Sequence, residues 1–77
     1  MTVKIYSTPT CPWCHKVKEF LTAHKVDFKD FDVSKDREAA QEMVKFSGQM
    51  GVPVLNINGE LVVGFDEGRI RNLLKLK

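Results

Sequence analysis

This 77-residue sequence lacks any apolar run that approaches the roughly 20 residues of a membrane-spanning helix. It also lacks a strong charge of one sign: 12 basic and 10 acidic residues give a net charge of +2, and the basic residues are scattered rather than clustered. Residues 1–10 lack the charged segment, apolar run and cleavage site of an export signal. We therefore expect a cytoplasmic protein whose partner is neither a membrane nor a nucleic acid.

Cysteine is equally scarce, and both copies lie in the segment Cys11-Pro12-Trp13-Cys14. A disulfide between residues three apart would close a very small loop and constrain the unfolded chain little, which argues against a purely structural bridge. In a reducing compartment such a pair is more often catalytic than permanently oxidised. The pair therefore indicates a redox centre, because it can close a disulfide and open it again.

Two other uses of the cysteine pair are alternatives. The run Cys11-x-x-Cys14-His15 also fits the attachment pattern of c-type haem, although haem attachment normally belongs to exported proteins. A zinc site would need four ligands, for which only Cys11, Cys14, His15 and His24 can be named. The chain has no second cysteine pair, and the spacing of the two histidines is poor for zinc. Both alternatives are weaker than redox exchange.

The residues around the pair predict different roles for its two thiols. If a helix begins at Pro12, where proline is well suited, Cys11 is its N-cap. The first-turn N–H groups and the helix dipole then favour thiolate over thiol at Cys11. The dipole alone is too weak, so direct N–H···S bonds, an S–H···S bond from Cys14 and the charge of Lys16 or Lys18 must add to it. Cys14 is expected to be more buried and to attack the mixed disulfide that Cys11 forms.

The remaining sequence predicts one small α/β domain, residues 1–77, with the element order βαβαββα. Strands are expected at Thr2–Ser7, Asp27–Val33, Val52–Ile57 and Glu60–Gly64. Helices are expected from Pro12 to about His24, from a cap at Ser34 to Ser47-Gly48, and from a cap at Asp66. Their buried positions are expected to be Cys14, Val17, Phe20 and Leu21, then Ala40, Met43 and Val44, and finally Ile70, Leu73 and Leu74.

The connections between the strands predict how the sheet is built. A helical crossover joins the first two strands, so these should be parallel. Asn58-Gly59 separates the last two strands and is typical of a two-residue hairpin, because both positions tolerate a positive φ. We expect a four-stranded mixed sheet with helices on both faces.

Three motifs in this order resemble a glutaredoxin. They are the CxxC motif after the first strand, Gly51-Val52-Pro53 before the third, and Val63-Gly64-Phe65-Asp66-Glu67 before the last helix. The likeness covers essentially the whole chain and implies a thioredoxin-like fold. An isolated Val-Pro bond would be expected to be trans, at the first residue of a strand. The resemblance instead implies that the Val52–Pro53 bond is cis and lies beside the cysteine pair.

The resemblance also implies a substrate groove. The backbone of Val52 would pair with an extended substrate as a short added strand. Gly64, Phe65 and Asp66 match the segment that grips the γ-glutamyl end of glutathione, and Asp66 can at the same time be a plain N-cap. The indole of Trp13 could pack against a partner or lie on the helix surface. The candidate substrate-binding residues are Pro12, Trp13, Val52, Pro53, Gly64, Phe65 and Asp66.

The electron donor is where the chain departs from the family pattern. Thr8 stands where a cation usually meets the glycyl carboxylate of glutathione, and Met50 follows Gln49 where another cation often lies. Each lost charged hydrogen bond is worth about 1.5–3 kcal/mol, so glutathione should bind weakly unless Lys16 compensates. Gly64-Phe65 also resembles the redoxins that serve ribonucleotide reductases and draw on a flavoprotein of the thioredoxin-reductase type. The expected reductant is such a flavoprotein, glutathione, or both.

The prediction from the sequence is thus a monomeric dithiol–disulfide oxidoreductase that reduces disulfide-containing proteins. Cys11 attacks, Cys14 resolves, and no metal or cofactor beyond the thiols is needed. The alternative is a module that holds an iron–sulfur cluster or a metal through Cys11, with glutathione as co-ligand. Pro12 and the second cysteine argue against that alternative.

Overall fold

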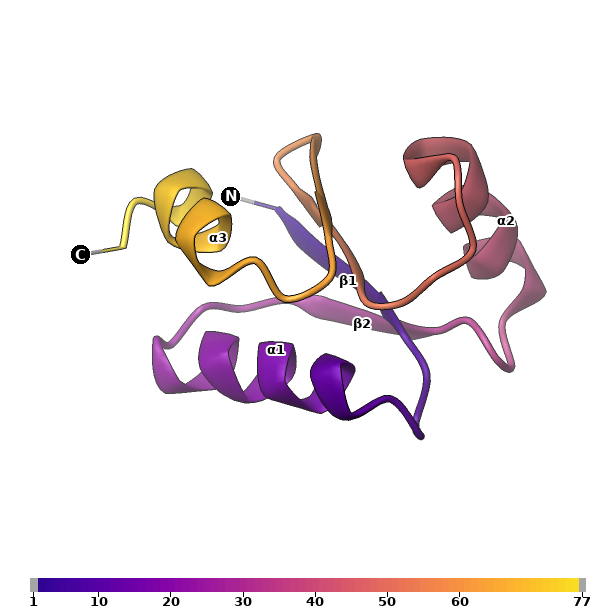
Figure 1. The fold of residues 1–77 in the computed structure, drawn as a ribbon, viewed down its shortest axis with the longest axis horizontal. Coiled ribbons are helices and arrows are strands. Elements are labelled where there is room, and N and C mark those ends of the chain that lie inside the picture. Colours follow the sequence, from indigo (N-terminus) through magenta and orange to yellow (C-terminus); the bar gives the residue numbers. More distant parts are fainter. Residues whose placement is uncertain (1, 77) are drawn as a thin grey trace.

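The computed structural model describes residues 2–76, and its helices and strands follow the predicted order (Figure 1). They are β1 (Val3–Ser7), α1 (Pro12–Ala23), β2 (Lys29–Asp32), α2 (Arg37–Ser47), β3 (Val54–Ile57), β4 (Glu60–Val63) and α3 (Glu67–Leu74). β2 and β3 begin later than predicted. Val52 and Pro53 precede β3, since proline has no N–H to give to a ladder. Val26 and Phe28 pack against the core ahead of β2 instead of extending it.

The four strands form one mixed sheet in the order β2-β1-β3-β4, as predicted. β1 runs parallel to β2 and antiparallel to β3, so that Ile5 lies between Asp30 and Leu55. β3 and β4 form the predicted hairpin, in which Asn58 has φ 54° and Gly59 has φ 90°. This topology puts β1 in the centre of the sheet, with its carboxyl end leading into α1.

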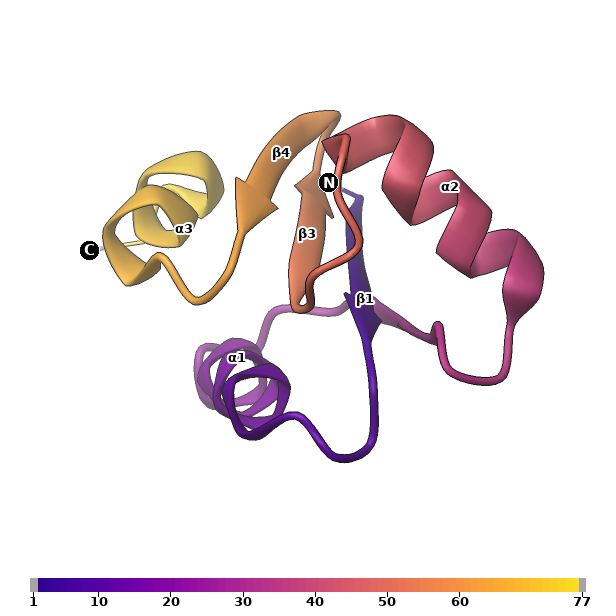
Figure 2. The ribbon, with the colours of Figure 1, turned by 45° about the vertical axis from the view of Figure 1, so that its right-hand side comes forward.

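Helices cover both faces of the sheet, and each face has its own core (Figure 2). α1 and α3 pack on one face through Val17, Leu21, Ile70 and Leu74, against Val3, Ile5, Leu55, Ile57 and Val62. α2 packs on the other face through Ala39 and Met43, against Tyr6 and Val54. Among residues 2–76 no helix combines the length and the apolar character that crossing a membrane requires.

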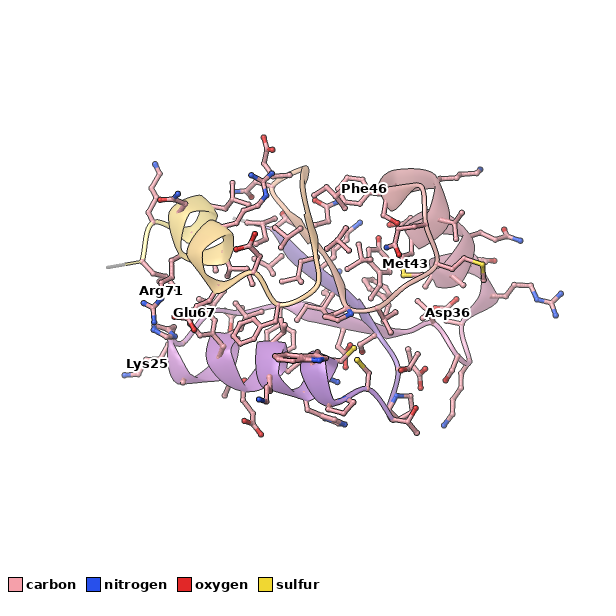
Figure 3. The ribbon with its side chains drawn as sticks, in the orientation of Figure 1. Lys25, Asp36, Met43, Phe46, Glu67 and Arg71 are labelled. Carbon is pink, nitrogen blue, oxygen red and sulfur yellow. The ribbon has the colours of Figure 1, made fainter. Side chains whose placement is uncertain are left out.

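Two predictions for α2 are wrong. Asp36 and not Ser34 is its N-cap, with the Asp36 Oδ1 accepting from the Ala39 N–H at 3.0 Å. Ser34 instead binds Asp32 in the preceding turn, where its N–H donates to Oδ1 at 2.9 Å. The buried stripe also differs: Ala39 and Met43 are buried, whereas Val44 is 37% exposed. Apolar residues occupy two neighbouring stripes of this helix, and the stripe that continues to Phe46 faces the sheet (Figure 3).

Both outer strands of the sheet are short. β2 is four residues long, and three of these are charged: Lys29, Asp30 and Asp32. β4 is also four residues long, and Arg69 of α3 reaches over it. The Arg69 Nε donates to the Leu61 carbonyl oxygen at 3.1 Å, and its Nη2 lies 3.6 Å from a carboxylate oxygen of Glu60. Arg69 thus occupies an acceptor of the β4 backbone.

Candidate active site

The two cysteines lie at the start of α1, just beyond the carboxyl end of β1. Cys11 is the N-cap and has an extended conformation, and Pro12 is the first residue of the helix, as predicted. The Cys11 Sγ accepts a hydrogen bond from the Cys14 backbone N–H at 3.2 Å. This bond is one of the direct N–H···S contacts that favour a thiolate at a helix N-terminus.

The two thiols differ in their surroundings. Cys14 is completely buried, whereas Cys11 is partly exposed, which confirms the predicted order of burial. Burial raises the pKa of the Cys14 thiol to about 11, and its hydrogen bond with Cys11 acts in the same direction. A hydrogen bond with the backbone of Thr8 and the positive charge of Lys18 act against this rise in the pKa of Cys14. The geometry leaves Cys11 as the thiol that an incoming disulfide can reach.

A pocket of about 290 Å³ is lined by Trp13, Val52, Pro53, Gly64 and Phe65, and its Val52 is a neighbour of the Cys11 sulfur. The Val52–Pro53 bond is cis, which confirms the expectation drawn from the family resemblance. The Cys11 Sγ lies 4.0 Å from the Val52 carbonyl oxygen, and the Gly64 N–H donates to the Pro53 carbonyl oxygen at 2.8 Å. Three separate segments are thereby held together around one sulfur.

The other two candidate substrate-binding residues lie outside that lining. Pro12 is exposed in the first turn of α1. Asp66 is the N-cap of α3, where its Oδ1 accepts from the Arg69 N–H at 3.2 Å. Larger hollows exist on α2, but they lie away from the cysteines and are lined by residues such as Glu38, Gln41 and Lys45. None of the residues lining these hollows is a thiol or histidine.

The two positions at which the family resemblance leads us to expect a cation, Thr8 and Met50, carry uncharged side chains. Met50 is 80% exposed and apolar, and Thr8 is partly buried and neutral. Lys16 of α1 is the cation that could compensate, and its Nζ lies over the Trp13 ring, 4.8 Å from the ring centre. This cation–π contact ties Lys16 to the indole at the mouth of the pocket.

The site also contains three residues to which the sequence assigned no role, namely Ser7, Asp30 and Gln49. The side chain of Gln49 bonds the backbone of Gly51, two residues before the cis bond. Below the cysteines, the Ser7 Oγ donates to Asp30 at 2.6 Å, and the Lys18 Nζ donates to the same carboxylate at 2.9 Å. The register between β1 and β2 places Asp32 opposite Ser7 and Asp30 diagonally from it on the same face, so no local motif indicates the contact between Ser7 and Asp30.

The described residues offer no ready-made metal site. Within residues 2–76, no three side chains of histidine, cysteine, aspartate or glutamate converge as a protein-only metal centre would need. His15 and His24, named as candidate zinc ligands, each bond a backbone carbonyl instead, of Pro9 and Phe20 respectively. The structure therefore does not bring together the ligand set of the zinc alternative.

Known proteins resemble this chain along most of its length. The family model described as Glutaredoxin matches residues 3–62. An uncharacterized glutaredoxin-like 8.6 kDa protein in the rubredoxin operon of Clostridium pasteurianum is 49% identical over 73 residues, which cover 95% of this chain and 97% of that protein. Glutaredoxin 3 of Escherichia coli K12 is 34% identical over 65 residues, covering 84% and 78% respectively. Among solved structures, a variant of the thioredoxin-like protein BC3987 has a TM-score of 0.94 at 34% identity, covering 99% and 97%.

Proposed function

This chain belongs to the glutaredoxin family, and we propose that in this dithiol oxidoreductase Cys11 is the attacking thiol and Cys14 the resolving one. The observation that carries the proposal is the asymmetry of the pair: Cys11 borders the pocket and accepts an N–H, while Cys14 is completely buried behind it. An incoming disulfide therefore meets Cys11 first.

The exchange takes two steps. The Cys11 thiolate attacks one sulfur of a substrate disulfide, forms a mixed disulfide with it and releases the other sulfur as a thiolate. Cys14 then loses its proton to solvent, and its thiolate attacks the Cys11 Sγ. The Cys11–Cys14 disulfide forms and the second substrate sulfur leaves as a thiolate, so the substrate gains two electrons and the protein pair loses two. A reductant returns the pair to its dithiol form.

The pocket beside Cys11 is the proposed place of the substrate. Val52 precedes β3, and we expect its backbone N–H and C=O to pair with an extended substrate segment as in strand addition. Trp13 and Phe65 would contact the substrate side chains through their apolar surfaces. Gly64, Phe65 and the N-terminus of α3 at Asp66 would face the end of the substrate away from Val52.

We further propose a thioredoxin-reductase-type flavoprotein as the better electron donor, with glutathione as the poorer one. The support is the neutral pair Thr8 and Met50 and the placement of Lys16 over the Trp13 ring. The flavoprotein would dock on the apolar surface formed by Trp13, Val52 and Phe65. We expect this chemistry in the reducing cytoplasm, with a disulfide-containing protein as the electron acceptor.

A coupled assay tests the assigned roles. NADPH oxidation is followed while a disulfide substrate is reduced, with either glutathione and its reductase or thioredoxin reductase supplied. Cys11→Ser should abolish turnover with both donors, because the first attack has no other thiol within reach of the pocket. Turnover that survives in Cys11→Ser would overturn the proposed roles.

A further inference from the structure

A small network of hydrogen-bonded polar side chains lies near the cysteine pair, on the face of the sheet that α1 covers. Its centre is Asp30 of β2, whose two carboxylate oxygens accept from different elements. The Ser7 Oγ of β1 donates to Oδ1 at 2.6 Å, and the Lys18 Nζ of α1 donates to Oδ2 at 2.9 Å. Ser7 is 2% exposed and the Lys18 side chain 23%, whereas the Asp30 side chain between them is 37% exposed, so the network is screened from solvent best at Ser7.

The residues at the two ends of this network, Lys18 and Ser7, are both close to Cys14 or to a residue bonded to it. Lys18 follows Cys14 by four residues in α1, so the two side chains lie on the same side of the helix. Ser7 directly precedes Thr8, whose backbone is hydrogen-bonded to the Cys14 thiol. The titratable groups that act on this thiol are Cys11, the N-cap of α1, and Lys18 of α1, and Asp30 of β2 forms an ion pair with Lys18.

Building on the thiol roles proposed above, we infer that Lys18 is a positioning residue for the resolving step, whose ammonium charge stabilises the Cys14 thiolate, and that Asp30 limits how much of that charge Cys14 experiences. The resolving step needs such a charge because burial disfavours the Cys14 thiolate. Cys14 is buried, and burial raises its pKa, so at neutral pH only a small fraction of it is thiolate. A cation fixed one turn away increases that fraction without being consumed in the reaction.

Substitutions of Lys18 and of Asp30 should therefore have opposite effects on the thiolate fraction of Cys14. Removing the charge of Lys18 lowers the thiolate fraction of Cys14. Neutralising Asp30 raises that fraction, because Lys18 loses the anion that compensates it. The asparagine oxygen can still accept from Lys18, and its amide nitrogen can donate to the Ser7 Oγ. A shift of one pKa unit changes the thiolate fraction about tenfold, and the accompanying change in nucleophilicity offsets about threefold of this, so the resolving rate changes about threefold. A purely structural role would make both variants slower.

The experiment separates the two chemical steps in the full-length reduced protein. Dithiobis(nitrobenzoate) is mixed with it in a stopped-flow instrument, and the released thionitrobenzoate is followed by absorbance over a range of pH. The first release reports attack by Cys11 and depends on reagent concentration. The second release reports resolution by Cys14 and does not. Failure of the proposed thiol roles would appear as a first phase that Cys11→Ser does not remove, which is distinct from any change in the second phase.

Four variants are compared, each checked by thermal melting. Lys18→Met should slow the second phase about threefold or more and move its pH midpoint upward, and it should change the first phase less than the second. Asp30→Asn should speed the second phase and move the midpoint downward. Lys18→Arg keeps the charge and should keep the rate. Lys29→Met removes an equal charge from the opposite face of β2 and should change neither phase.

Opposite shifts in Lys18→Met and Asp30→Asn, with Lys18→Arg unchanged, support the inference. Any other combination overturns it, including two variants that are slowed alike or a midpoint that neither variant moves. If Lys18→Met does not fold, Lys18→Gln is read in its place against the same criteria.

Discussion

The side chain of Gln49 is hydrogen-bonded to both backbone polar groups of Gly51. Its Oε1 accepts from the Gly51 N–H at 2.5 Å, and its Nε2 donates to the Gly51 carbonyl oxygen at 3.0 Å. A Cβ at Gly51 would lie 2.6 Å from that Oε1, so any larger residue there displaces the amide. Gly51 directly precedes Val52, whose backbone we propose as the partner of the substrate.

The first prediction is that Gln49→Ala and Gly51→Ala have the same functional effect. Each change removes the same pair of hydrogen bonds, which would leave the segment before Val52 less ordered when substrate arrives. We expect KM for a disulfide peptide to rise about twofold to tenfold in either variant, with little change in kcat. In a double-mutant cycle the combined variant should be no worse than either single one. Additive effects would show that the two residues act separately.

The second prediction concerns the order in which the thiols react. Iodoacetamide at pH 7 should label Cys11 in the reduced protein and leave Cys14 unlabelled, because Cys14 is buried and its pKa is raised to about 11. Peptide mapping by mass spectrometry identifies the labelled residue. In denaturant both thiols should react at similar rates, which is the matched control. Labelling of Cys14 before Cys11 would contradict the assignment.

A third prediction follows for alkaline pH. Because folding raises the pKa of Cys14 from 9.0 to about 11, the reduced thiol adds stability that is complete below pH 9 and is lost as the pH rises through about 11. The loss is at most about 3 kcal/mol in the free energy of unfolding. About half of that loss, on the order of 1.4 kcal/mol, should have occurred by pH 10, and urea denaturation under reducing conditions at pH 7 and pH 10 measures it.

The control for alkaline stability is Cys14→Ala, which removes this titration. Tyr6 also has a raised pKa, from burial first and then from its hydrogen bond to Glu42, and it stays in the variant. The alkaline loss of stability in Cys14→Ala should therefore be smaller than in the unmodified protein but not zero. An equal loss in both proteins would show that Cys14 contributes nothing to it.

The fourth prediction is that Cys14→Ser stops after the first chemical step. Cys11 still attacks the substrate disulfide, but no second thiol can release it. A covalent mixed disulfide should accumulate to about one substrate half per protein, and it should be visible as added mass that dithiothreitol removes. Free glutathione can replace the missing thiol, so some glutathione-dependent turnover should remain. A variant that turns over with the flavoprotein as fast as the unmodified protein would show that Cys14 does not resolve.

The fifth prediction concerns the electron donor. Thr8→Lys combined with Met50→Arg should raise glutathione-dependent turnover about tenfold or more, since each restored charged hydrogen bond is worth about 1.5–3 kcal/mol. Turnover with thioredoxin reductase should change much less. The donor assignment is wrong if the unmodified protein already runs on millimolar glutathione as fast as glutaredoxin 3 of Escherichia coli, measured side by side.

Local patterns were sufficient for much of the fold and for the cysteine pair. Pro12 after Cys11 predicts the N-cap, and Asn58-Gly59 predicts the hairpin, because each depends on the conformation of one or two residues. The buried face of α2 could not be chosen in this way. Its apolar residues allow two stripes, and only packing on Tyr6 and Val54 decides between them.

The same limit applies to the site. The resemblance of three motifs predicted that Trp13, Val52, Pro53, Gly64 and Phe65 would lie together, and they line one pocket. Gln49 was passed over because a glutamine in a loop has no characteristic pattern. The contact between Ser7 and Asp30, which are 23 positions apart, depends on the register that places Asp32 opposite Ser7 and Asp30 opposite Ile5. The sequence alone does not reveal which residues of β1 and β2 lie opposite each other.

The protected outer edges of the sheet have a consequence for how this protein behaves when it is concentrated. An open strand edge invites another chain to pair with it, which is how sheet proteins begin to aggregate. Here the charges of β2 and the guanidinium of Arg69 on the Leu61 carbonyl oxygen make both outer strands poor templates for a visiting chain. If Val52 accepts a substrate strand as proposed, backbone pairing is confined to a place beside the reactive sulfur. Such a carrier can be abundant in a crowded compartment without joining into fibres.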